Sequence, residues 1–201
     1  MRQALIVIDV QKFFSSKSTR SIVAKIARYL DQRSHEYSKI FFTIFKNDKN
    51  SPLWQIAKWQ GCQKSPQTDI CDEIKPFTGK TNLFYKNILS AAKVPAIKHG
   101  LAAAKINEVH LCGFDTDCCI LATTYDLFDQ NIKPVILENL TWSTSKEKLH
   151  GAAIKMIKRN IGFAQNVWNL AAFFLEKTRC KGQEGQCFLI DDQRHIASDK
   201  K

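Results

Sequence analysis

The sequence lacks several features that would place it in common functional classes. No apolar run approaches the roughly 20 residues of a membrane-spanning helix, so we expect no contact with a membrane. The N-terminus enters a short apolar run with no small-residue cleavage site, which argues against a signal peptide. No glycine-rich turn follows that run, and this argues against a dinucleotide-binding site.

The sequence also lacks the cysteine and histidine spacings of disulfide frameworks and zinc sites. Its seven cysteines are odd in number and form no CxxC pair, and several lie in predicted strands or helices. This usage is typical of a reducing compartment, so we expect a cytoplasmic protein. The five histidines are scattered, with none between positions 36 and 98, and they show no zinc-ligand spacing.

The charge balance is strongly basic, with a formal net charge of +11. Such a charge could indicate an acidic partner such as nucleic acid. The lysines are spread along the chain, however, and few aromatic residues are interleaved with them. We interpret the charge as a soluble basic surface and do not expect nucleic acid as the partner.

The length of 201 residues suits one α/β domain with a sizeable core. Apolar runs of strand length alternate with segments of helical spacing, which predicts a single-domain three-layer α/β/α sandwich with a mainly parallel, about six-stranded Rossmann-like sheet. We expect the domain at residues 1–177 and a polar tail at 178–201. The predicted strands are residues 4–10, 39–45, 83–85, 108–112, 134–137 and 163–167, and the predicted helices include 18–30, 53–59, 91–104, 145–159 and 168–176.

One segment in the middle of the chain is the most informative about function. It follows the apolar run 108–112, leads into a helical pattern, and reads Gly113-Phe114-Asp115-Thr116-Asp117-Cys118-Cys119-Ile120. Cys119 therefore lies on the first turn of a helix, where the helix dipole and free backbone N–H groups favour a thiolate and a developing oxyanion. That position is useful for a nucleophile.

Two further charged residues follow predicted strands. Asp9 ends the first predicted strand, and Lys86 follows the short strand 83–85. Because parallel strands end at one edge of a sheet, both side chains can converge with Cys119 there and form a nucleophilic site. Taken singly, each has a structural interpretation: Cys119 as an inert buried thiol, Asp9 as a cap or surface carboxylate, and Lys86 as a solvated lysine.

Three blocks of the sequence carry a resemblance to a known family. Residues 6–11 with Phe13 and Phe14 look like a D-x-Q-x-x-F opening, residues 86–91 like a K-x-x-x-S-A block, and residues 113–119 like a G-x-x-T-D-x-C elbow. In motifs, order and spacing the chain resembles the isochorismatase-like cysteine hydrolases, which include nicotinamidase and N-carbamoylsarcosine amidase. The resemblance covers about residues 4–170.

The resemblance implies a role for each residue. Cys119 would be the nucleophile, Asp9 would accept its proton and later activate water, and Lys86 would hold positive charge beside both. A cis peptide between Phe114 and Asp115 would direct the N–H groups of Asp115 and Cys119 at the substrate oxygen. The implied reaction is hydrolysis of the C–N bond of a small amide through a thioester acyl-enzyme, in a homo-oligomer.

The chain departs from the nicotinamidases in one segment. Those enzymes bind a metal through an Asp-x-His pair after the second strand, whereas residues 45–51 read Phe-Lys-Asn-Asp-Lys-Asn-Ser. We therefore expect no metal and no other cofactor, and we do not expect nicotinamide as the substrate. Ala92, where the family often has phenylalanine, suggests an altered pocket wall. Candidate pocket residues are Phe14, Asn47, Ser51, Trp54 and Trp59.

Two alternatives to the amidase interpretation stay open. The first is a non-catalytic binding protein on the same fold, whose basic surface would meet an acidic or nucleic-acid partner. The second keeps the fold but cleaves an ether or an ester, because isochorismatases have another residue at the position of Cys119 and cleave a vinyl ether. A cysteine at position 119 favours the amidase branch.

Overall fold

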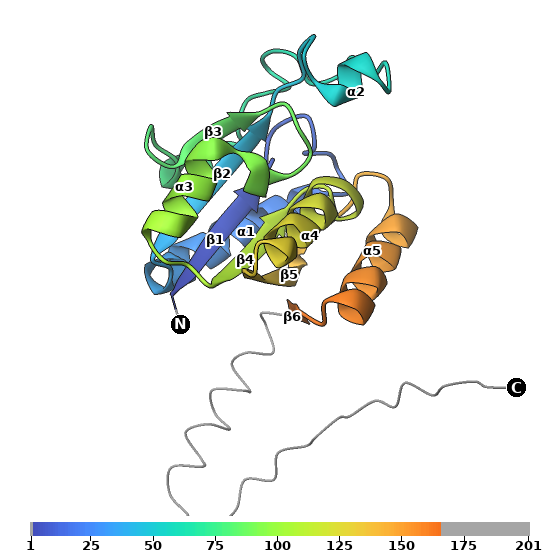
Figure 1. The fold of residues 1–201 in the computed structure, drawn as a ribbon. Helices are drawn as coiled ribbons and strands as arrows, with labels where there is room; N and C mark the ends of the chain where they lie inside the picture. The colour runs from blue at the N-terminus through green and yellow to red at the C-terminus, as the bar shows by residue number, and fades with distance from the viewer. Residues whose placement is uncertain (1, 166–201) are drawn as a thin grey trace, which may run out of the picture. The chain divides into compact units, whose positions relative to one another are not determined.

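A six-stranded parallel sheet lies at the centre of residues 2–165, the part of the chain that the computed structural model describes (Figure 1). Its order is β3-β2-β1-β4-β5-β6, and every pairing between these strands is parallel. This arrangement confirms the predicted fold class. The strands are β1 (Gln3–Ile8), β2 (Lys39–Phe45), β3 (Leu83–Lys86), β4 (Glu108–Gly113), β5 (Lys133–Thr141) and β6 (Ala164–Gln165).

Helices cover both faces of the sheet. Helix α1 packs on one face against β4 and β5, while α3, α4 and α5 lie on the other face (Figure 1). Because both faces are covered, strand β1 is a continuous apolar run rather than an alternating one. The helices are α1 (Arg20–Arg33), α2 (Pro52–Gln55), α3 (Pro95–Ala103), α4 (Leu121–Asp129) and α5 (Glu147–Asn160).

The core on the side of α3, α4 and α5 explains the choice of residues in β1. Ala4, Ile6 and Ile8 pack there with Ile97 of α3 and Leu127 of α4. Side chains alternate along a strand, so the intervening residues of β1 face the layer that contains α1. The apolar positions of α1 supply that layer, and they are Ile22, Val23, Ile26, Tyr29 and Leu30.

Several predicted boundaries differ from the structure. The helix expected at 91–104 begins at Pro95, after a 3₁₀ turn at 91–93, because proline fits only the first turn of a helix. The strand expected at 134–137 extends to Thr141, and the helix expected at 53–59 shortens to α2. The strand expected at 163–167 corresponds to β6. Residues 166 and 167 lie outside the described part of the chain, and so do the predicted helix 168–176, the predicted domain end at 177 and the predicted tail.

The long segment between β2 and β3 is anchored to the end of β1. Gln11 carries most of this anchoring: its Nε2 donates to the carbonyl oxygens of Phe45 and Gln67, each at 3.0 Å. Its Oε1 accepts the N–H of Phe45 at 2.8 Å. The backbone of Gln11 also bridges to Ile70. One amide side chain therefore holds the ends of two strands and the loop together.

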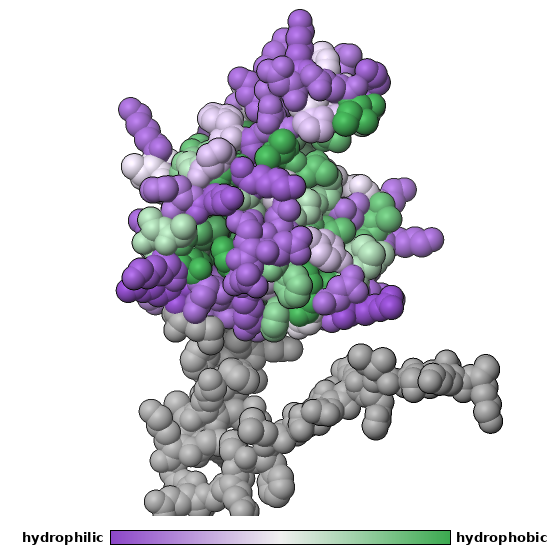
Figure 2. All heavy atoms as spheres, viewed as in Figure 1, coloured by the Kyte–Doolittle hydropathy of each residue, from purple (hydrophilic) through white to green (hydrophobic). Residues whose placement is uncertain are grey.

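The surface is mixed in character. Hydrophilic residues cover much of the face seen in Figure 2, and hydrophobic side chains interrupt them. Ile56, just after α2, is the most exposed of the large hydrophobic residues that the structure describes, at 81%. Within residues 2–165, none of the helices combines the length and the apolar character that crossing a bilayer would require.

A partly buried polar network occupies the opposite edge of the sheet, where the strands begin. His110 Nδ1 lies 2.7 Å from the hydroxyl of Tyr37, and His110 Nε2 lies 3.0 Å from Oε1 of Glu108. Lys133 forms an ion pair with Glu108 at 2.8 Å. Burial lowers the pKa of His110, and the neighbouring Glu108 only partly opposes this. The folded protein therefore favours the neutral imidazole.

We expect this network to make the protein sensitive to mild acid. Folding lowers the pKa of His110 below its unfolded value, so its contribution to stability is present above about pH 6.5 and is lost as the pH falls below that. The free energy of unfolding, measured with urea from about pH 7.5 to about pH 5.5, should fall for the wild type. It should fall less for His110→Gln. His99→Gln, at an exposed site on α3, is the matched control and should keep the wild-type slope. Equal slopes for all three proteins would contradict the prediction.

Candidate active site

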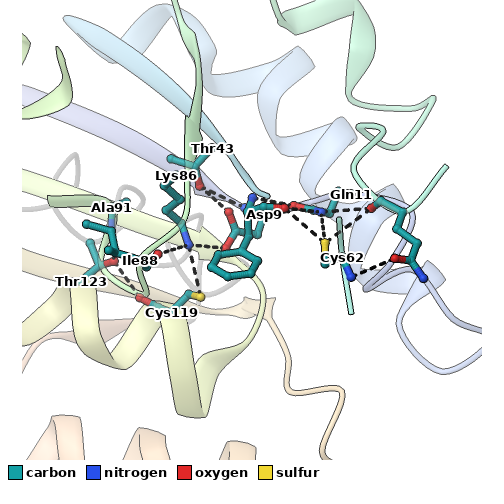
Figure 3. A network of polar contacts seen from close by, with 11 residues as sticks. Asp9, Gln11, Thr43, Cys62, Lys86, Ile88, Ala91, Cys119 and Thr123 are labelled. Carbon is teal, nitrogen blue, oxygen red and sulfur yellow. Dashed lines mark hydrogen bonds and ion pairs between the residues drawn. The ribbon is translucent and has the colours of Figure 1, made fainter. Parts of the chain in front are cut away.

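Asp9, Lys86 and Cys119 meet at the edge of the sheet where the strands end (Figure 3). Asp9 directly follows β1, Lys86 is the last residue of β3, and Cys119 lies in a π-helical turn, Thr116–Ile120, after β4. The Nζ of Lys86 lies 2.7 Å from Oδ2 of Asp9 and 3.4 Å from Sγ of Cys119. The structure thus brings together the three residues that the sequence selects.

The lysine reaches across a strand to make these contacts. Strand β2 lies between β1 and β3, so the side chain of Lys86 has to pass the end of β2 to reach Asp9. There its Nζ lies 5.0 Å from the ring centroid of Phe45. The third contact of the ammonium is the carbonyl oxygen of Ile88 at 3.1 Å. An ammonium has three N–H donors, and Lys86 has a polar partner for each of them.

A threonine on β2 orients the carboxylate of Asp9. The hydroxyl of Thr43 donates to Oδ1 of Asp9 at 2.8 Å, which leaves Oδ2 for the ion pair with Lys86. The N–H of Asp9 donates to the carbonyl of Thr43 at 3.1 Å. Sequence reasoning missed Thr43. The sequence could have pointed to Thr43, because it is the one polar residue in the apolar run Ile40 to Phe45.

Burial sets the charge state of the site. The side chains of Asp9 and Lys86 are fully buried, and Cys119 is 5% exposed. The adjacent Cys118 thiol and burial raise the pKa of Cys119 well above its ordinary value, with Asp9 adding to them and Lys86 opposing them. Burial lowers the pKa of Lys86, but Asp9 and Cys119 more than offset it and the pKa is raised.

The ion pair therefore lies beside a thiol whose pKa is raised. This direction is opposite to the effect that the sequence analysis expected from the helix N-terminus at Cys119, because the burial of the sulfur depends on the packing of distant segments. A neutral thiol needs a base before it can attack, and Asp9 is the carboxylate that shares Lys86 with it.

The turn before Cys119 has an unusual backbone. Gly113 has a φ of 112°, and a Cβ added there would lie 2.0 Å from the carbonyl oxygen of Ile8, so only glycine fits between β4 and β1. The peptide bond between Phe114 and Asp115 is cis. Among the described residues, the N–H of Asp115 has no hydrogen-bond acceptor.

The segment after β5 holds this turn in place. The N–H of Thr116 donates to the carbonyl of Trp142 at 3.1 Å. The carboxylate of Asp115 accepts two hydrogen bonds from Thr144, one from the N–H at 2.8 Å and one from the hydroxyl at 2.6 Å. His150 of α5 lies 2.9 Å from the hydroxyl of Thr116. The turn is therefore fixed by long-range contacts as well as by its own backbone.

A pocket of about 310 Å³ gives access to the thiol. Phe14 and Trp59, two of the predicted pocket residues, lie in its lining. Its walls are mostly aromatic or aliphatic, with only a few polar groups. The lining residues are Phe13, Phe14, Phe45, Leu53, Trp59, Leu89, Asp115, Cys118, Cys119 and Thr144. Sequence reasoning did not assign Phe13, Phe45, Leu53, Leu89, Cys118 or Thr144 to it.

Three predicted pocket residues do not belong to this lining, which corrects the prediction for them. Asn47 is 2% exposed, and its amide donates to the carbonyl of Trp59 at 2.8 Å, so it supports the pocket wall from behind. Ser51 is fully buried just before α2, and Trp54 lies within α2. Ala92, expected to alter the wall, is buried in the core.

The segment after β2 does not offer a metal centre. Within residues 2–165, no three His, Cys, Asp or Glu side chains gather closely enough to hold a metal ion. The carboxylate of Asp48 instead lies 3.3 Å from the amide nitrogen of Asn87. The residues present therefore do not fit a metal, and we derive no chemical step through one.

Comparisons with known proteins agree with this geometry. A family model described as the isochorismatase domain matches residues 3–167. The chain belongs to the isochorismatase family, and the resemblance stated from its motifs is confirmed. No curated protein sequence gives a significant match.

Solved structures share the fold at low sequence identity. An isochorismatase-like hydrolase from Alkaliphilus metalliredigens superposes with a TM-score of 0.75 at 16% identity, covering 87% of this chain and 100% of that one. The nicotinamidase PncA from Bacillus subtilis gives a TM-score of 0.72 at 22% identity, covering 83% and 100%. An N-carbamoylsarcosine amidase from Thermoplasma acidophilum gives 0.71 at 17% identity, covering 83% and 96%.

The buried ion pair leads to a prediction about stability. Replacing Lys86 with Met leaves the carboxylate of Asp9 buried without a countercharge, which typically costs about 3–5 kcal/mol of stability. The double variant Lys86→Met, Asp9→Asn removes the orphaned charge and should recover most of that loss. Urea unfolding of the wild type, both single variants and the double variant measures the coupling between the two residues.

A surface ion pair supplies the control for this cycle. Lys93 lies 3.3 Å from Asp126, and its side chain is 64% exposed. Lys93→Met should change the free energy of unfolding by no more than about 1 kcal/mol, because solvent screens such pairs. A loss for Lys86→Met as small as that for Lys93→Met would show that Asp9 and Lys86 do not form a buried pair.

Proposed function

We propose that this protein hydrolyses the C–N bond of a small amide, with Cys119 as the nucleophile. One observation carries the proposal: a buried ammonium contacts both a carboxylate and a thiol, and that thiol lies in the lining of a pocket. Membership of the isochorismatase family supports a hydrolase, and two structural neighbours bear the names nicotinamidase and N-carbamoylsarcosine amidase. We also propose that the reaction needs no metal, because the residues after β2 offer no ligand set for one.

The first half of the proposed reaction forms an acyl-enzyme. Asp9 takes the proton of the Cys119 thiol, and the sulfur forms a bond to the amide carbonyl carbon while the carbonyl π electrons move to the oxygen. The N–H groups of Asp115 and Cys119 would stabilise that oxyanion. The C–N bond then breaks, the amine leaves with the proton held by Asp9, and a thioester on Cys119 remains.

The second half releases the product. Asp9 takes a proton from water, and the oxygen of that water attacks the thioester carbonyl. The carbon–sulfur bond breaks, the acid departs, and Cys119 recovers its proton from Asp9. Lys86 stays protonated throughout and offsets the negative charge that moves between Asp9 and the sulfur. Its raised pKa is consistent with this constant charge.

The alternative of a non-catalytic binding protein lacks support. Family membership indicates a hydrolase, and the pocket lining contains an acidic residue but no basic one among the residues described. Such a pocket does not suit phosphate groups. We therefore propose a small-molecule amide as the partner.

The test is the release of ammonia from a panel of small amides that includes carbamoyl compounds and aromatic carboxamides. Cys119→Ala should lower the rate on any substrate that is found by at least about 1,000-fold, because no other nucleophile lies in its place. Acid quenching during turnover should trap the acyl group on the peptide that contains Cys119. Hydroxylamine should remove it, as expected of a thioester.

Two controls separate this mechanism from others. Cys71→Ala changes a buried cysteine that is not in the pocket lining and should keep the wild-type rate. Treatment with EDTA should leave the rate unchanged if no metal takes part. Turnover that survives in Cys119→Ala would refute the proposed nucleophile, and turnover that EDTA abolishes and zinc restores would refute metal independence.

A further inference from the structure

The pocket has an unbalanced negative charge. Asp115 is the only lining residue, among those described, whose side chain is normally charged at neutral pH. Lys86 and Asp9, which are not in the lining, form an ion pair in which their charges cancel. The carboxylate of Asp115 therefore has no countercharge in the pocket, although the protein as a whole is strongly basic.

The hydrogen bonds of Asp115 do not use up its capacity as an acceptor. Both of its oxygens accept from Thr144, one from the N–H and one from the hydroxyl. A carboxylate has about four lone-pair sites, so two remain for a further donor. Burial raises the pKa of Asp115, and the nearby carboxylates of Asp117 and Asp9 add to this shift. A positive ligand would relieve both effects.

The remaining walls suit a cation as well. Four aromatic rings form a connected series: the centroids of Phe14 and Phe13 are 5.1 Å apart, those of Phe13 and Trp59 are 5.6 Å apart, and those of Trp59 and Phe45 are 6.1 Å apart. The faces of such rings attract positive charge. Phe45 already has one cation, the Lys86 ammonium, 5.0 Å from its centroid.

We propose that this pocket selects amides that carry a positive charge, with Asp115 as the counter-ion and the rings of Phe13, Phe14, Phe45 and Trp59 as an aromatic cage. The cavity of about 310 Å³ has room for a single ring with a cationic centre. An amide that carries a carboxylate is disfavoured, because it would place like charges together. A neutral amide gains the apolar contacts but leaves Asp115 partly desolvated and unpaired. Asp115 is thus a specificity-determining residue of the site.

Three ligands of nearly the same shape test the charge preference. They are 1-methylpyridinium-3-carboxamide, which is a cation, 3-methylbenzamide, which is neutral, and 3-carbamoylbenzoate, which is an anion. Calorimetric titration into full-length Cys119→Ala measures binding without turnover. We expect the cation to bind at least about tenfold more tightly than the neutral amide, and the anion to bind most weakly.

Asp115→Asn in the same background keeps the size of the side chain and removes its charge. It should reduce the preference for the cation over the neutral amide to about threefold or less. Asp31→Asn, at an exposed site on α1, removes one negative charge away from the pocket and should keep the full preference. Circular dichroism checks that each variant is folded. If Asp115→Asn does not fold, the affinity ratio between the cation and the neutral amide, measured with the protein that retains Asp115, still tests the charge preference.

Several results would overturn the proposal. They are equal binding of the cation and the neutral amide, tighter binding of the anion, no saturable binding of the cation, or a cation preference that survives in folded Asp115→Asn. The proposal rests on the proposed function for its place in a reaction, but its readout is binding alone. A cation preference without ammonia release would refute the proposed hydrolase but not the charge selection. Ammonia release without a cation preference would refute the charge selection but not the proposed hydrolase.

Discussion

The ion pair between Lys86 and Asp9 is the interaction on which the rest of the site depends. Both side chains are fully buried, so neither charge is tolerable without the other. The pair exists because β2 separates the two strands by a distance that a lysine side chain can span. Once formed, it places an ammonium against the sulfur of Cys119 and a carboxylate within the same cluster. The residues that we propose as the base and the nucleophile are thus both held by the side chain of Lys86.

Contacts from several elements of the scaffold position this cluster. Thr43 orients Asp9 from β2, and Gln11 ties β1, β2 and the following loop together. The glycine at 113 lets β4 approach β1 closely enough for the turn that carries Cys119. The walls of the pocket come from the segment after β1, the long loop, the segment after β3, the stretch after β5, the end of β2 and the turn that carries Cys119.

The sequence predicted the parts of the molecule that follow from regular patterns. Apolar runs at βαβ spacing predicted the parallel sheet, and the parallel sheet in turn predicted that Asp9, Lys86 and Cys119 would end at one edge. It could not predict the path of residues 46–80, which depends on long-range contacts such as the hydrogen bond from Gln11 to Gln67, and Asn47, Ser51 and Trp54 therefore lie outside the pocket lining. The protonation state of the thiol was also out of reach, because burial is a property of the folded packing.

The most direct test of this account is the pH dependence with which iodoacetamide alkylates Cys119, followed by mass spectrometry of the peptide that contains it. The account predicts that half-maximal reactivity lies above the ordinary thiol value of about 8.5, because the adjacent Cys118 thiol, burial and Asp9 raise the pKa of Cys119. In Asp9→Asn the midpoint should move to lower pH, since the carboxylate no longer opposes the effect of the Lys86 ammonium on the thiol. A midpoint near neutral pH in the wild type that stays in place in Asp9→Asn would contradict the account.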